Sequence, residues 1–223
     1  MSNRLNVSTT YYNEAYYAWQ GKSGELGAQI DAWKFRPFLN DQMRVLDFGC
    51  GGGFMLASLP ARERWGVEVN PVAAREAAKR LDRVLCSVSD IPPDQKIDAI
   101  ISHHALEHVE RPLDTLRDLR PMLASSGRVI FIVPAESWYQ HSSFDPKDIN
   151  QHLYTWTPLL LGNLFSHAGY KVESVEILCH RWTPKAALAR RLLNRRVYDL
   201  ACRATAFLTF YRQLRIVAVP LSV

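Results

Sequence analysis

The chain has 223 residues, of which 48% are hydrophobic and 22% are charged, with a formal net charge of +5. This length suits one α/β domain with additions, and the composition is ordinary for a globular protein with a real hydrophobic core. An uninterrupted apolar run of about 18 residues is lacking, which excludes a membrane span, and the first residues do not read as a signal peptide.

The four cysteines lie far apart in the sequence. They are Cys50, Cys86, Cys179 and Cys202, and none belongs to a C-x-x-C pair. This spacing favours reduced, mostly buried thiols over disulfides or a zinc site. We therefore expect a cytoplasmic protein without a bound metal.

The first 40 residues precede the regular part of the chain. A tyrosine-rich stretch, 11–19, is followed by a predicted helix from Glu25 to Leu39. The tyrosines either form a lid, since aromatic faces attract cations, or pack on the core. We interpret residues 1–40 as an N-terminal helical lid.

From residue 43 onward, strand patterns alternate with helix patterns. Strands are predicted near 43–48, 64–69, 83–86, 97–102, 127–133, 171–178 and 214–219, and helices near 54–59, 71–81, 112–123 and 158–168. The strands at 97–102 and 127–133 are nearly all apolar, as expected of strands that are covered on both faces. This alternation predicts an α/β fold with a parallel sheet and helices on both sides.

Residues 45–53 read Val-Leu-Asp-Phe-Gly-Cys-Gly-Gly-Gly and form the most informative segment. An aspartate, Asp47, closes the first strand, and three glycines follow at alternate positions: Gly49, Gly51 and Gly53. Glycines allow a sharp turn and a close approach of a ligand to the backbone. A dinucleotide-binding loop needs glycine at the first, third and sixth places, and Phe54 occupies the sixth, so that fingerprint does not match.

The spacing Asp-x-Gly-x-Gly-x-Gly instead resembles motif I of the class I S-adenosylmethionine (SAM) dependent methyltransferases. A second acid supports this resemblance, because Glu68 ends the next strand about twenty residues after the glycine loop. A carboxylate at that place can accept both hydrogen bonds from an adenosine ribose. Asn70-Pro71 then supplies an N-cap and a proline for the following helix.

The likeness continues along the chain. Residues 98–109, with Leu106-Glu107-His108, resemble the fourth-strand region, and 123–130 resemble the loop into the fifth strand. Asp90-Ile91-Pro92 and Ala168-Gly169-Tyr170 match later family turns. The resemblance covers roughly 40–180 and the final strand. It implies a Rossmann-like seven-stranded sheet whose last strand runs antiparallel between the fifth and sixth, with SAM over the carboxyl ends of the strands.

The resemblance also implies a set of cofactor-binding residues. They are Asp47, Gly49, Cys50, Gly51, Gly53, Glu68, Val69, Ser87, Val88 and His103. Ser87 stands where the family often has an aspartate for the adenine amino group. Either Ser87 accepts that hydrogen bond or Asp90 substitutes for it.

Histidines are the candidates for acceptor chemistry, because a hydroxyl or ammonium acceptor must lose a proton and imidazole titrates near neutrality. His103 and His104 follow the fourth strand, where adjacent side chains point in opposite directions, so one of them faces the site. We select His104 as the base, with backbone and cap contacts as the alternative. His152 is predicted to contact the substrate, the alternative being a cap of the following helix, whereas His108 is interpreted as structural.

The positive charge is concentrated late in the chain. Residues 181–215 carry nine basic side chains and one acid, a net +8 that leaves −3 for the remainder. We divide the chain into the lid, a SAM-binding core (41–183), a basic helical insertion (184–212) and the final strand (213–223). The insertion either covers the sheet edge, forms a homodimer, or rests on an anionic membrane or a partner protein.

Three functional hypotheses follow. The first is a methyltransferase acting on an oxygen or nitrogen of a small molecule, including a sugar of a surface polysaccharide. The second is an RNA methyltransferase that uses the basic segment, although the adenine-amino and cytosine-C5 signatures are lacking. The third is a non-catalytic SAM-binding adaptor. The chain is expected to be a monomer or a homodimer.

Overall fold

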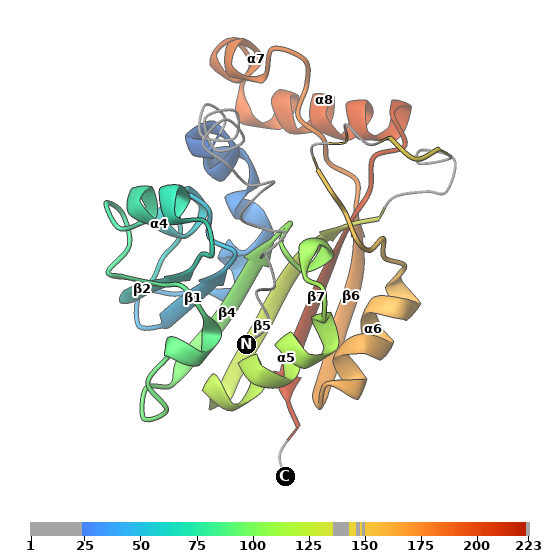
Figure 1. The fold of residues 1–223 in the computed structure, drawn as a ribbon. Helices are drawn as coiled ribbons and strands as arrows, with labels where there is room; N and C mark the ends of the chain where they lie inside the picture. The colour runs from blue at the N-terminus through green and yellow to red at the C-terminus, as the bar shows by residue number, and fades with distance from the viewer. Residues whose placement is uncertain (1–23, 136–142, 146–147, 149, 222–223) are drawn as a thin grey trace.

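The computed structural model describes residues 24–135, 143–145, 148 and 150–221. Seven strands form one sheet in the order β3-β2-β1-β4-β5-β7-β6 (Figure 1). The strands are β1 (Arg44–Phe48), β2 (Glu63–Val67), β3 (Arg83–Leu85), β4 (Ile97–His103), β5 (Leu123–Pro134), β6 (Tyr170–Leu178) and β7 (Gln213–Pro220). Only β7 runs antiparallel to its neighbours, between β5 and β6. The predicted fold class and topology are confirmed.

Helices connect the strands. They are α3 (Phe54–Ala57), α4 (Pro71–Ala77), α5 (Pro112–Leu119), α6 (Pro158–His167), α7 (Ala186–Leu192) and α8 (Arg195–Leu208), preceded by a helix over 24–31. Single 3₁₀ turns occupy Ala32–Lys34, Arg36–Phe38, Val88–Asp90, Leu106–His108 and Arg120–Met122. No described helix is both long and apolar enough to cross a bilayer.

The sheet separates two hydrophobic cores. Ile100 and its neighbours in one core pack beneath α5 and α6 through residues such as Leu116 and Phe165. Ile101, the next residue of β4, belongs to the other core, which lies beneath α3, α4 and the 32–39 segment. Both faces of the central strands are therefore buried, which explains their continuous apolar sequence.

Several predicted helices end earlier than expected, including 54–59 at Ala57 and 71–81 at Ala77. The sequence predicts one helix over Glu25–Leu39, but the regular helix stops at 31 and two 3₁₀ turns follow. Pro37 prevents a regular helix from reaching Leu39, because its ring would clash with the carbonyl four residues earlier and it lacks an amide proton. Pro121 has the same effect after α5, where the predicted helix 112–123 closes in a 3₁₀ turn.

The basic segment forms two helices beyond the carboxyl ends of the strands, next to the helix at 24–31 (Figure 1). Tyr198 and Cys202 of α8 are buried against Ile30. The described part of the chain has no disulfide; Cys50 and Cys202 are buried, whereas Cys86 and Cys179 are exposed, contrary to the prediction of mostly buried thiols.

The hydroxyl of Tyr170 anchors β6 to α5, since it donates to the buried carbonyl of Leu116 at 2.8 Å. Tyr170→Phe leaves that carbonyl unpaired and should lower the free energy of unfolding by about 1–3 kcal/mol. Urea denaturation measures the loss. The control is Tyr154→Phe, whose exposed hydroxyl donates to the Glu110 carbonyl and which should cost no more than about 0.5 kcal/mol. Equal effects would contradict the anchoring role.

Candidate cofactor and acceptor site

The glycine loop follows β1 in a conformation that requires its glycines. Gly49, Gly51 and Gly53 have φ of 74°, 53° and 76°. A Cβ on Gly49 would lie 2.4 Å from the Cβ of Ala105. The amides of Gly49 and Cys50 donate to the Val67 carbonyl at 2.9 and 3.1 Å, which ties the loop to the end of β2. Main chain therefore lines the crevice where a side chain would fill it.

Glu68 lies just beyond β2 and holds this loop in place. Its Oε2 accepts from the Gly51 amide and its Oε1 from the Asn70 amide, both at 2.8 Å. Burial raises the pKa of Glu68, although the backbone amides of Asn70, Gly51 and Val69 oppose this shift. Asn70 in turn caps α4, as predicted, by accepting from the amides of Val72 and Ala73. Each oxygen of Glu68 retains a lone pair that can accept from a ligand hydroxyl.

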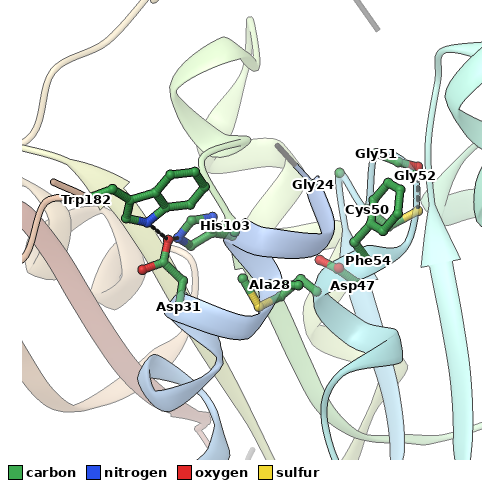
Figure 2. A pocket seen from close by; sticks show the side chains of 13 residues that line it. Gly24, Ala28, Asp31, Asp47, Cys50, Gly51, Gly52, Phe54, His103 and Trp182 are labelled. Atoms are coloured by element: carbon green, nitrogen blue, oxygen red, sulfur yellow. Dashed lines mark hydrogen bonds and ion pairs between the residues drawn. The ribbon is translucent and has the colours of Figure 1, made fainter. Parts of the chain in front are cut away.

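A cavity of about 210 Å³ opens between the glycine loop and the helix at 24–31 (Figure 2). It is lined by Gly24, Gly27, Ala28, Asp31, Asp47, Gly49, Cys50, Gly51, Gly52, Phe54, Met55, His103 and Trp182. The predicted cofactor residues Asp47, Gly49, Cys50, Gly51 and His103 thus come together. Glu68 and Gly53 adjoin the cavity through the loop rather than lining it.

Asp47 is 2% exposed and faces this cavity. Burial, and then the charge of Glu68, raise the pKa of Asp47 to about 7. A cation beside Asp47 would stabilise its ionised form. The cradle of bare main chain, the acid at the switch point between β1 and β4 and the second acid after β2 fit a ligand that carries a ribose and an ammonium group, as SAM does.

The opposite wall was not predicted. The Asp31 carboxylate accepts from Trp182 Nε1 at 3.2 Å (Figure 2). The same carboxylate pairs with Lys34 Nζ at 3.0 Å. Lys34 Nζ also lies 3.2 Å from His103 Nε2. Burial lowers the pKa of Lys34 and lowers that of His103 well below its usual range. The wall thus holds a neutral imidazole beside a buried ion pair.

No sequence motif marks the residues of this wall. The feature of the sequence that could have indicated it is a pair of glycines in the 24–31 helix, Gly24 and Gly27. A Cβ on Gly27 would meet the Trp182 ring at 2.6 Å, and one on Gly24 would meet the Phe54 ring at the same distance. Only glycine allows the helix to approach both rings so closely.

Of the two adjacent histidines, His103, which is among the predicted cofactor residues, lines the cavity, and His104 does not. His104 has a φ of 56°. Its Nδ1 lies 3.1 Å from Glu107 Oε1, and its Nε2 contacts the amide nitrogen of Gln213 on β7. The rings of His103 and His104 remain in edge contact, with centroids 4.7 Å apart. His104 is therefore one ring away from the cavity, and its role as the base stays a prediction.

His152 lies beside His108. Its ring centroid is 4.9 Å from that of His108, and the adjacent Leu153 amide donates to the Glu107 carbonyl at 2.9 Å. Burial, and then the charge of His152, lower the pKa of His108, while Glu107 opposes the shift. Glu107, His108 and His152 are grouped closely enough to hold a metal ion, although the sequence predicts none.

The predicted adenine residues lie after β3. The Ser87 hydroxyl accepts from the Ser89 amide at 3.2 Å, and the Asp90 carboxylate accepts from the Ser87 amide at 2.9 Å. Both side chains thus form a capping box around one 3₁₀ turn. The adenine role of Ser87 and the neighbouring Val88, like that of Val69 after β2, stays a prediction.

Gly49→Ala should distort the cofactor loop, because it places a side chain at positive φ and against Ala105. We expect a loss of about 1 kcal/mol or more in unfolding free energy and a clear loss of affinity for S-adenosylhomocysteine (SAH) by calorimetry. The control is Gly162→Ala in α6, where the new Cβ meets nothing nearer than 3.8 Å. That change should leave SAH binding intact. Unaltered binding by Gly49→Ala would refute the close approach.

Known proteins resemble this chain in sequence and fold. A ubiquinone biosynthesis O-methyltransferase of Parvibaculum lavamentivorans is 29% identical over 109 residues, 44% of this chain and 42% of that protein. The one of Vibrio campbellii is 30% identical over 100 residues, 40% of this chain and 42% of that protein. The chain thus matches less than half the length of these curated relatives.

A solved SAM-dependent methyltransferase of Archaeoglobus fulgidus superposes with a TM-score of 0.64 at 20% identity, covering 91% of this chain and 98% of that one. At this identity the likeness concerns the fold. The family model described as a methyltransferase domain matches residues 26–175, which include the glycine loop, both acids and every residue that lines the cavity except Gly24 and Trp182. The chain therefore belongs to the methyltransferase-domain family and is of the SAM-dependent class.

Proposed function

We propose that this chain transfers a methyl group from SAM to an oxygen or nitrogen of a small molecule. The cavity between the glycine loop and the 24–31 helix, with Asp47 on its wall and Glu68 behind its loop, carries this proposal. SAM, when bound, supplies a methyl group on a sulfonium. The chain's own residues bind and orient the two molecules and shield them from water, because such a displacement depends mainly on alignment.

In this proposal each of the two acids binds a different part of the cofactor. Glu68, already held by two amides, accepts from the ribose hydroxyls. Asp47 pairs with the amino-acid ammonium, and the amides of the glycine loop approach the ligand directly. Ser87 and Val88 border the adenine.

On the acceptor side, His104 is the proposed proton acceptor. Its Nδ1 faces the Glu107 carboxylate, which favours the tautomer with the proton on Nδ1 and leaves Nε2 basic. Gln213 contacts Nε2 in the structure, so an acceptor hydroxyl would replace this amide. His152 completes the same side of the site.

The acceptor class is supported by the relatives. Two of them are named as O-methyltransferases of ubiquinone biosynthesis, which favours an oxygen acceptor on a small molecule. A surface-polysaccharide sugar is a narrower hypothesis, based on the family resemblance alone. Incubation with radiolabelled SAM and a panel of phenols, catechols, sugars and amines tests the proposal. Absence of SAH binding would overturn it.

RNA is the second candidate, because a cavity of about 590 Å³ on the far side of the 24–31 helix contains an arginine cluster. The arginines are Arg36, Arg190, Arg195, Arg196 and Arg203. Contacts to phosphates would make RNA binding fall steeply with salt. Weak binding that is insensitive to salt would dismiss this candidate.

Glu68→Ala should weaken SAH binding by about 10- to 100-fold, since it removes the charged acceptor of the ribose and the restraint on Gly51. Glu173→Ala, at an exposed acid on β6, is the matched control and should bind as the parent does. Calorimetric titration gives both dissociation constants. Equal constants would remove Glu68 from the cofactor site.

Asp47→Asn should change the pH dependence of SAH binding. In the free protein Asp47 has a pKa of about 7, so at lower pH the ligand ammonium must displace a proton from the carboxyl group. Affinity should therefore rise with pH up to about 7 and then level off. The asparagine variant should bind more weakly and lack this rise. Parallel pH profiles would contradict the pairing of Asp47 with the ammonium.

A further inference from the structure

A second polar cluster lies beside the cavity, where the 3₁₀ turn Leu106–His108 meets the 150–156 segment. One ligand atom from each of Glu107, His108 and His152 lies within 4.8 Å of the others. The three come from two segments that are well separated in the sequence, so the fold assembles the cluster.

Glu107 gives the cluster its unusual character. The side chain is 0% exposed, and its Oε1 is engaged by His104. Its Oε2 is also buried, and within the described part of the chain no group forms a hydrogen bond to it. A buried carboxylate oxygen without a partner is costly unless a cation compensates it.

The backbone fixes the histidine that completes the cluster. The Leu153 amide donates to the Glu107 carbonyl at 2.9 Å, and the Tyr154 hydroxyl donates to the Glu110 carbonyl at the same distance. These bonds on the C-terminal side of His152 hold its segment against the turn that carries Glu107 and His108. One main-chain bond and one side-chain bond thus position the backbone of this segment.

We infer that Glu107, His108 and His152 form a binding site for a divalent transition-metal ion such as Zn²⁺. Two imidazoles and one carboxylate are a ligand set that zinc and its neighbours accept, whereas Mg²⁺ and Ca²⁺ prefer oxygen ligands. Zinc ligands lie about 2.0–2.2 Å from the ion, so small side-chain rotations would close the cluster around it. His104, bonded to Glu107 Oε1, is a positioning residue for that carboxylate.

The inferred metal site also has a consequence for the methyl acceptor, and this extension rests on the proposed function. The ring of His104 joins Glu107 to His103, which lines the cavity. Three protein ligands leave a coordination position open for an oxygen of the acceptor, and a bound metal lowers the pKa of such a hydroxyl. The inferred ion therefore favours alcohol or phenol acceptors over amines.

The test is metal titration of the tag-free chain after treatment with a chelator. Zn²⁺ should bind with a stoichiometry of one by calorimetry, and Co²⁺ should produce visible absorption from the bound ion. His152→Ala and Glu107→Gln should each weaken Zn²⁺ binding by about tenfold or more. His167→Ala, at an exposed histidine of α6, is the matched control and should bind Zn²⁺ as the parent does.

SAH titration of the same proteins separates this inference from the proposed function. SAH binding without Zn²⁺ binding would overturn the metal site alone, and so would equal Zn²⁺ affinity in the parent and in His152→Ala. A Mg²⁺ affinity equal to that for Zn²⁺ would overturn the role of the imidazoles. Because Glu107 is fully buried, circular dichroism checks that its variant folds, and His152→Ala tests the site independently of that residue.

Discussion

The carboxylate of Glu68 is the interaction on which the site depends. One side chain accepts from Gly51 in the loop after β1 and from Asn70 in the loop after β2. Three glycines at positive φ would leave the first loop with many conformations in the absence of such a restraint. Glu68 therefore orders the main chain that lines the crevice while retaining lone pairs that can accept from a ligand hydroxyl. Its position directly after β2 follows from the parallel register of the central strands, which brings their carboxyl ends to one edge.

The parts of the chain outside the alternating core complete the cavity. The helix at 24–31 supplies one wall, and Trp182, from the connection after β6, closes over it. Helix α8 then packs on the outer side of the same helix through Tyr198 and Cys202. The basic insertion thus supports the wall of the cavity. Four of its arginines, Arg190, Arg195, Arg196 and Arg203, line a second cavity on the other side of that wall, apart from the one beside the glycine loop.

Local patterns predicted the strands, the parallel α/β arrangement and the glycine loop, because alternation, apolar runs and glycine spacing involve only a few neighbouring residues. The antiparallel position of β7 was implied by the family resemblance and not by these patterns. The predicted helix from Glu25 to Leu39 was too long because the prediction gave too little weight to Pro37. The contact of Lys34 with His103 carries no motif, since it joins segments far apart in the sequence. The ion pair of Asp31 with Lys34 is local, but no pattern in the sequence marks it as buried. The orientation of His104 depends on a left-handed backbone that non-glycine residues rarely adopt, so the pattern at the strand end did not predict that this ring would lie against Glu107 and Gln213.

The charge of the cavity distinguishes among adenosine-containing ligands. Two carboxylates, Asp31 and Asp47, are among its lining side chains, and the described residues that line it include no arginine or lysine. Lys34 lies behind the wall, where its ammonium is paired with Asp31, and burial keeps His103 neutral by lowering its pKa. A dinucleotide would bring two phosphates against this acidic surface, whereas an adenosyl ligand with an ammonium and a sulfonium brings positive charge to it. The electrostatics therefore favour the same ligand as the glycine spacing, on independent physical grounds.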